Sequence, residues 1–179
     1  MKMMADCLKN SINPVQVGDL TVGGGRLVIA AGPCALESYD GALQIAIEMK
    51  KLCAEFNFGY IFKASFDKAN RTSIHSFRGP GIDEGLEWLA SIGREAGVPL
   101  VTDMHEPWQA THLAQVVDLI QIPAFLCRQT DLLVAASATG SPAGTTHGCA
   151  GPATSGSAPA SDTTKGTWAL MASETMRPK

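Results

Sequence analysis

The sequence has few charges, few aromatic residues and no long hydrophobic run. Charged residues make up 17% of its 179 residues, against about 25% in typical globular proteins. Its 14 basic and 17 acidic residues leave a net charge of -3, so binding to nucleic acid or an anionic membrane has no electrostatic support. Apolar runs such as residues 27–31 are far shorter than the ~20 residues that span a bilayer. These absences predict a globular protein without nucleic-acid or membrane partners.

The sequence also lacks any regular arrangement of cysteines. The five cysteines are odd in number and irregularly spaced, with no Cys-x-x-Cys motif, which argues against a zinc finger or a redox pair. They are Cys7, Cys34, Cys53, Cys127 and Cys149. No apolar stretch of signal-peptide length follows the first residues. We therefore expect reduced thiols and a cytoplasmic location.

Composition divides the chain into three segments. From residue 141 to residue 179, 28 of 39 residues are Ser, Thr, Gly, Ala or Pro. So little apolar area cannot offset a backbone entropy cost of roughly 1–2 kcal/mol per ordered residue. We predict an N-terminal extension over residues 1–16, a folded domain over 17–140 and a low-complexity, mostly disordered tail over 141–179.

Hydrophobic periodicity predicts four strand–helix repeats within the folded domain. Short apolar runs indicate strands over residues 26–31, 60–62, 99–102 and 116–122. Apolar residues at three-and-four spacing indicate helices over residues 39–56, 81–96, 107–115 and 128–137. This order requires parallel strands with right-handed crossovers. An open doubly wound sheet and half of a barrel both satisfy it.

The positions of the polar residues favour the barrel. Cys34 and Glu37 follow the first predicted strand, and polar stretches at residues 63–71, 103–106 and 121–129 follow or end the other three. Barrel enzymes place their chemistry at the carboxyl ends of many strands, whereas open sheets concentrate it at one switch point. We predict an α/β fold that is the N-terminal half, about four βα units, of a TIM (β/α)8 barrel.

The second predicted strand leads into a loop that suits anions. Its polar residues are Lys63, Ser65, Lys68, Asn70 and Arg71. A lysine is a compact charge and an arginine a two-pronged donor, so together they can hold carboxylate or phosphate groups in a fixed orientation. The alternative is a solvated basic loop whose charge is balanced by Asp67.

Three further positions have both a functional and a structural interpretation. The stretch from Asp103 through His105 to Glu106 ends a strand, and its carboxylates could equally cap the next helix. Gln121 lies in an apolar strand, where its amide needs either a substrate oxygen or neighbouring backbone as a partner. Cys34 is either a metal ligand or a small core residue, and none of the four histidines has clear ligand spacing.

Five segments, taken together, resemble a known family. They are residues 31–38 (AGPCALES), 62–73 (FKASFDKANRTS), 77–81 (FRGPG), 102–106 (TDMHE) and 121–131 (QIPAFLCRQTD). In collinear order, from about residue 17 to 140, they are similar to the 3-deoxy-D-manno-octulosonate 8-phosphate synthases. The second and fifth segments are highly specific, whereas the first is shared with the related 3-deoxy-D-arabino-heptulosonate 7-phosphate synthases.

The resemblance implies a function for these residues. Family members are transferases of lipopolysaccharide sugar synthesis, homotetrameric barrels that condense phosphoenolpyruvate with D-arabinose 5-phosphate and water and release phosphate. The implied substrate-binding residues are Lys63, Ser65, Lys68, Asn70, Arg71, Gln121 and Ala124. Lys68 is also implied to be catalytic. Lys63, Lys68, Gln121 and the backbone near Ala124 would hold phosphoenolpyruvate. Asn70 and Arg71 would hold the sugar phosphate, and Asp103, the second implied catalytic residue, would orient the sugar.

The resemblance also implies a metal ligand and raises alternatives. Metal-dependent members carry a cysteine at the position of Cys34, where the metal-independent members carry asparagine. Their other ligands, a histidine, a glutamate and an aspartate, belong to the second half of the barrel, whose motifs do not occur in residues 141–179. We therefore expect this chain to be inactive alone and to show poor solubility, self-association or no stable fold. The alternatives are a heptulosonate synthase-like enzyme and a non-catalytic subunit that pairs with the full-length enzyme.

Overall fold

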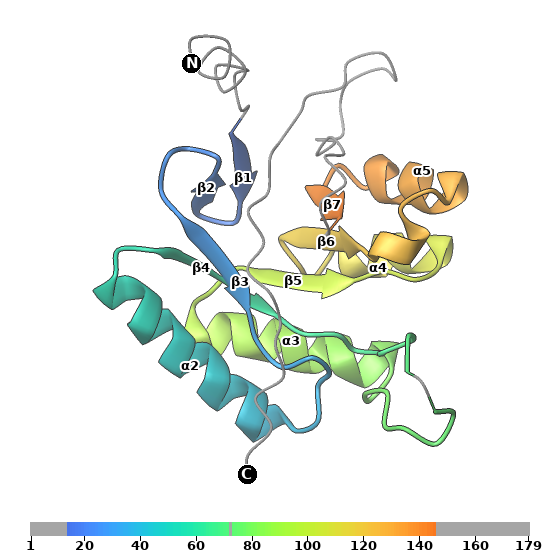
Figure 1. The fold of residues 1–179 in the computed structure, drawn as a ribbon, viewed down its shortest axis with the longest axis horizontal. Helices are drawn as coiled ribbons and strands as arrows, with labels where there is room; N and C mark the ends of the chain where they lie inside the picture. Colours follow the sequence, from blue (N-terminus) through green and yellow to red (C-terminus); the bar gives the residue numbers. More distant parts are fainter. Residues whose placement is uncertain (1–13, 72, 146–179) are drawn as a thin grey trace, which may run out of the picture.

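The computed structural model describes residues 14–71 and 73–145, which form a curled parallel sheet with helices on one face (Figure 1). The five strands are β3 (Val28–Ala31), β4 (Gly59–Lys63), β5 (Leu100–Asp103), β6 (Leu119–Ile122) and β7 (Ala143–Thr145). They pair side by side in chain order, and all four pairings are parallel. This architecture confirms the predicted half barrel. The predicted disorder of the tail concerns residues that lie almost entirely outside the described ranges.

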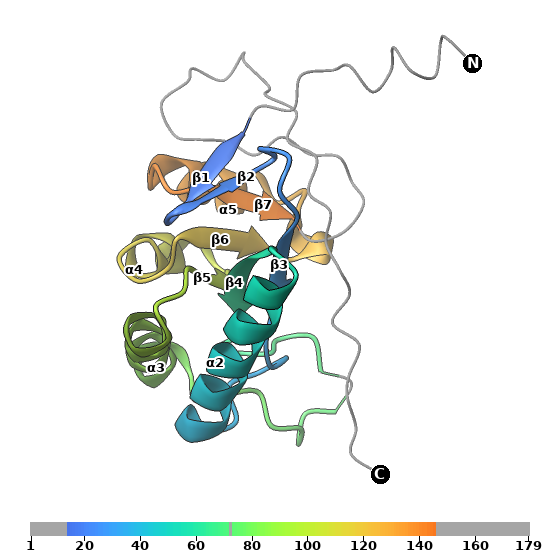
Figure 2. The same cartoon turned by 90° about the vertical axis from the view of Figure 1, so that its left-hand side faces the viewer.

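Helices connect the strands in the predicted order. They are α2 (Tyr39–Glu55), α3 (Ile82–Ala96), α4 (Ala110–Leu113) and α5 (Thr130–Ala138), with the 3-10 turns η1 (Pro107–Gln109) and η2 (Ala124–Leu126). In Figure 2, α3 and α4 lie together on one side of the sheet. None of the described helices is long and apolar enough to cross a membrane.

Local sequence explains where the two long helices begin and end. Ser38 caps α2, because its Oγ accepts a hydrogen bond from the Gly41 amide at 3.3 Å. Helix α3 ends at Gly97, whose φ of +61° is readily adopted by glycine. The predicted single helix over residues 107–115 is instead η1 followed by one turn of α4. Pro107 and the reciprocal capping contacts of Glu106 and Gln109 tighten that first turn.

The sheet has a different apolar core on each face. Phe62, Leu100 and Ile120 belong to the core that packs under the helices. Their neighbours Ile61, Val101 and Leu119 belong to a smaller core on the opposite, inner face. This division follows from the period of two along a strand, which sends successive side chains to opposite faces.

A hairpin that the sequence analysis did not predict covers part of the inner face. Strands β1 (Val15–Val17) and β2 (Leu20–Val22) pair antiparallel, and Val17 is fully buried against the inner core. Gly18 at its turn has a φ of +57° and lies against Pro99 and Asp118, at the amino ends of β5 and β6. The predicted boundary between residues 16 and 17 therefore falls inside β1.

The sheet also continues past the predicted boundary at residue 140. Strand β7 pairs in parallel with β6, with Gln121 opposite Gly144, and Ala143 is buried. Three residues of small side chains give too weak a pattern to stand out from the Ser-, Gly- and Ala-rich sequence that follows. The folded unit is therefore four βα units and the strand of a fifth.

The turn directly after β3 brings the backbone of Gly32 very close to β4. A Cβ atom at this position would lie 2.1 Å from the backbone oxygen of Lys63, which cannot move without disturbing the sheet. We expect Gly32→Ala to lower the free energy of unfolding by about 1–3 kcal/mol, the usual cost of forced overpacking. Gly24→Ala is the matched control, since the nearest atom to its Cβ would be Thr21 Cγ2 at 3.1 Å, and the nearest backbone atom among its three closest neighbours, Thr21 O, is at an ordinary contact distance of 3.6 Å. Equal denaturant midpoints for the two variants would contradict this prediction.

Candidate functional site

Three polar side chains meet at the carboxyl end of the inner face. Each lies two residues beyond an inner-core residue of the same strand: Lys63 in β4, Asp103 in β5 and Gln121 in β6. Because strand alternation has a period of two, they point to the same side as that core. Asp103 and Gln121 are also direct partners across the β5–β6 pair. The structure thus brings together three residues that the sequence analysis assigned to the site.

Asp103 is buried and forms a hydrogen bond with the His105 ring. His105 Nε2 lies 3.1 Å from Asp103 Oδ2, and the two side chains are only 12% and 7% exposed. Burial by itself would raise the pKa of Asp103, but the hydrogen bond from His105, the neighbouring Ser65 hydroxyl and the charges of His105 and Lys63 outweigh it and lower that pKa. Asp103 is therefore held as a carboxylate. The predicted site did not include His105. From sequence spacing alone, a functional role for the stretch around His105 could not be distinguished from a role at the start of the next helix.

The Lys63 ammonium is surrounded by ionisable groups from three segments. Burial lowers the pKa of Lys63 most strongly. The charge of Asp103 acts in the opposite direction, the charge of Lys68 lowers the pKa further, and Cys34 raises it. Cys34, Lys63, Lys68 and Asp103 are therefore close enough to interact, although they follow three different strands.

Several polar atoms at this site are buried without a hydrogen-bond partner. Among the described residues these atoms are Ser65 Oγ, Asp103 Oδ1, His105 Nδ1 and Gln121 Oε1; Thr102 Oγ1 is also unpartnered but lies on the opposite, helix-facing side of β5. An unsatisfied buried polar group costs about 1–3 kcal/mol. Neighbouring backbone, the structural explanation considered for Gln121, does not satisfy its side-chain oxygen. A cluster of such atoms at one end of a sheet is a mark of a ligand site.

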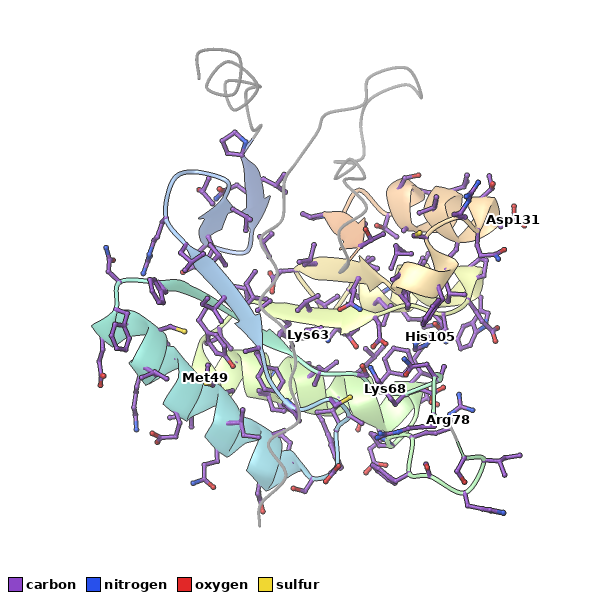
Figure 3. All side chains as sticks on the ribbon, viewed as in Figure 1. Met49, Lys63, Lys68, Arg78, His105 and Asp131 are labelled. Carbon is purple, nitrogen blue, oxygen red and sulfur yellow. The ribbon has the colours of Figure 1, made fainter. Side chains whose placement is uncertain are left out.

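An arm formed by residues 66–81 brings Lys68 to the same end of the sheet. Its base is closed by backbone hydrogen bonds from Lys68 N to Arg78 O, 2.6 Å, and from Gly81 N to Phe66 O, 3.1 Å. Arg78 also binds both carboxylate oxygens of Asp67, at 2.7 and 2.5 Å. The carboxylate of Asp67 therefore pairs with Arg78 and does not mainly neutralise the charges of Lys63 and Lys68. Figure 3 shows Lys68, Arg78 and His105 at the end toward which β5 and β6 run.

The remaining predicted substrate residues lie outside the buried cluster. Asn70 and Arg71 are exposed on the arm, and Arg71 Nε donates to Phe77 O at 3.0 Å. This contact leaves the two terminal guanidinium nitrogens for other partners. Ala124 is half-buried and begins η2, directly after Pro123. The structure therefore gathers Lys63, Ser65, Asp103 and Gln121 tightly and leaves the other predicted residues at the rim.

The described residues do not by themselves make a metal centre. Cys34 is a half-buried free thiol, and residues 14–71 and 73–145 contain no group of three His, Cys, Asp or Glu side chains placed to hold an ion. One thiolate is too few ligands for the transition metals that cysteine prefers. The ligand role of Cys34 stays a prediction, and we derive no chemical step through a metal.

Comparison with known proteins confirms the resemblance drawn from the motifs. A model of the DAHP synthetase I family matches residues 9–162. The chain is 52% identical over 134 residues to the 2-dehydro-3-deoxyphosphooctonate aldolase of Fusobacterium nucleatum subsp. nucleatum, covering 74% of this chain and 48% of that protein. It is 59% identical over 115 residues to the protein of the same name from Nitratidesulfovibrio vulgaris strain DP4, covering 64% and 42%. The chain thus spans about half the length of these curated relatives.

The lowered pKa of Asp103 gives a pH-dependent stability that can be measured. A carboxyl group whose pKa is lower folded than unfolded contributes stability above its ordinary value of 3.8, and this contribution is lost as the pH falls through the folded-state pKa. We expect Asp103→Asn to cost about 1–3 kcal/mol at pH 7 and progressively less toward pH 3. Denaturant titrations across this range measure the difference.

The matched control for this experiment is Glu87→Gln, which removes an exposed carboxylate from α3. It should change the free energy of unfolding by less than about 0.5 kcal/mol at every pH. A deficit of Asp103→Asn that stayed constant from pH 7 to pH 3 would show that the charge of Asp103 is not what stabilises the fold.

Proposed function

Because the chain belongs to the DAHP synthetase I family, we propose that its site binds phosphoenolpyruvate and D-arabinose 5-phosphate. The full-length reaction would be their condensation with water to 3-deoxy-D-manno-octulosonate 8-phosphate and phosphate. Relatives that are 50–59% identical carry the name 2-dehydro-3-deoxyphosphooctonate aldolase, which denotes the same octulosonate phosphate chemistry. A cytoplasmic location fits this role in making a lipopolysaccharide sugar.

The observation that carries this proposal is the charge pattern at the carboxyl end of the inner face. Two lysines lie beside a cluster of buried, unpartnered polar atoms. Both proposed substrates are anions that repel one another, so bringing them together requires cations fixed in advance. Lys63 and Lys68 supply those charges from β4 and from the arm.

Each substrate has its own set of residues in this proposal. Lys63, Lys68, the side-chain amide nitrogen of Gln121 and the backbone at Ala124 hold phosphoenolpyruvate. Asn70 and Arg71 hold the phosphate end of the sugar, and Arg71 does so with the nitrogens that its contact with Phe77 leaves over. Ser65 and Asp103 face the reacting groups from the floor of the site.

The proposal separates binding from turnover. The chain spans 48% and 42% of two relatives that it matches, so complete catalysis and the homotetramer belong to the full-length barrel. In a metal-dependent full-length enzyme, Cys34 would contribute one ligand. We propose that this chain binds the substrates without measurable turnover and pairs with itself or with the full-length enzyme.

Lys68 provides the direct test of substrate binding. We expect Lys68→Ala to weaken phosphoenolpyruvate binding by about tenfold or more, because a hydrogen-bonded charge pair is lost. The matched control is Lys51→Ala, since Lys51 is an exposed lysine of α2 whose partner is Glu48 at 3.0 Å. Isothermal titration calorimetry gives the affinities, and a phosphate-release assay with and without divalent metal tests for turnover.

Two outcomes would contradict the proposed function. Equal losses in the Lys68 and Lys51 variants would mean that the binding is non-specific charge attraction. Tighter binding of D-erythrose 4-phosphate than of D-arabinose 5-phosphate would instead identify a heptulosonate synthase-like site.

A further inference from the structure

His105 is held in place from several directions. Its ring packs edge-on against Phe66, with 5.9 Å between ring centroids and an interplanar angle of 65°. Its backbone amide donates to Gln109 Oε1 at 2.8 Å, and the Glu106 amide donates to the same oxygen at 3.2 Å. The turn after β5 and the imidazole orientation are therefore both fixed, so the 3.1 Å contact with Asp103 is built into the fold.

Two of the oxygens left unpartnered around this pair can only accept, whereas the Ser65 hydroxyl beside them can also donate. An ionised carboxylate only accepts hydrogen bonds, and the Gln121 side-chain oxygen does the same. In a neutral imidazole whose proton lies on Nε2, Nδ1 is an acceptor as well. Asp103 and Gln121 are direct partners on neighbouring strands, which lie about 4.8 Å apart. The single proton of the Ser65 hydroxyl can serve only one of these two oxygens, and a fully ionised phosphate or carboxylate provides no donor for the other.

We propose that His105 is a positioning residue of this site, holding Asp103 through Nε2 so that Asp103 Oδ1 and Gln121 Oε1 accept hydrogen bonds from a sugar hydroxyl group. The inference rests on the proposed function for the identity of the sugar, D-arabinose 5-phosphate. In this inference, different residues recognise the charged and the hydroxyl groups of the substrates. The lysines neutralise the anionic groups, and the acceptor pair recognises the polyhydroxyl part that phosphoenolpyruvate lacks.

The surroundings of Asp103 explain why it needs a donor. The ionisable groups that face it are His105 beyond its own strand and Lys63 on β4, and Lys63 in turn faces Lys68 and Cys34. Burial favours the neutral acid. Without the imidazole donor, the carboxyl group would be protonated at a higher pH, and its proton would change one acceptor of the pair into a donor.

Two substitutions separate donation from packing. His105→Phe keeps an aromatic ring against Phe66 but removes the donor, whereas His105→Gln keeps an N–H donor. We expect His105→Phe to raise the carboxyl titration midpoint of Asp103, followed by carbon-13 NMR, and to weaken D-arabinose 5-phosphate binding about tenfold or more. Phosphoenolpyruvate binding should stay within about threefold, and His105→Gln should restore both the midpoint and the sugar-phosphate affinity to near wild type.

The outcomes distinguish this inference from the proposed function. Unchanged sugar-phosphate binding in His105→Phe, or an equal loss for both ligands, would overturn the positioning role. If the wild-type chain binds neither ligand, the proposed function and the sugar assignment both fall, while the titration midpoint still decides whether His105 holds Asp103. Thermal melts check folding, and if His105→Phe does not fold, failure of His105→Gln to keep both the midpoint and the affinity overturns the inference.

Discussion

The alternation of side chains along the parallel strands determines where the site lies. Phe62, Leu100 and Ile120 face the helices, so the residues next to them must face the inside of the curl. At the amino end those inner positions are apolar and packed against the β1–β2 hairpin. Two residues further along, the same alternation places the polar side chains of Lys63, Asp103 and Gln121. The register that builds the core therefore also fixes the face and the depth of the polar cluster.

Burial makes the charges of that cluster interdependent. Removing a carboxylate or an ammonium from water is costly unless a partner of opposite charge or a hydrogen bond compensates. Asp103 receives both from His105 and Lys63, and its pKa falls despite its burial. Lys63 receives less compensation, because Lys68 opposes Asp103, and its pKa falls as well. The site thus holds an ionised acid next to a lysine whose charge an added anion would stabilise.

Long periodic elements could be predicted from sequence, and short ones could not. Helices α2 and α3 span enough turns for their apolar positions to repeat, and both match the prediction to within one residue at each end. The hairpin has three-residue strands, so the alternation of Val15, Val17, Leu20 and Val22 around a Gly-Asp turn was its only signal. The Asp67–Arg78 pair joins residues 11 apart across the arm, and the partner of a charged residue in a loop depends on a backbone path that composition does not reveal.

The exposure of apolar side chains on the helices agrees with the half-barrel geometry of the sheet. In a closed barrel each helix packs between two neighbours, and the large apolar side chains of α3 and α4, the middle helices, are not among the exposed ones. Helix α2 exposes Ile45 and Leu52, and α5 exposes Leu133 and Val134, by 39% to 59%. Along the chain, α2 follows the end strand β3 of the described sheet, and α5 precedes its other end strand, β7. Strands β4, β5 and β6, which carry the polar cluster, are internal to the described sheet, so the cluster does not depend on its end strands. The proposed substrate binding can therefore have different structural requirements from the proposed catalysis.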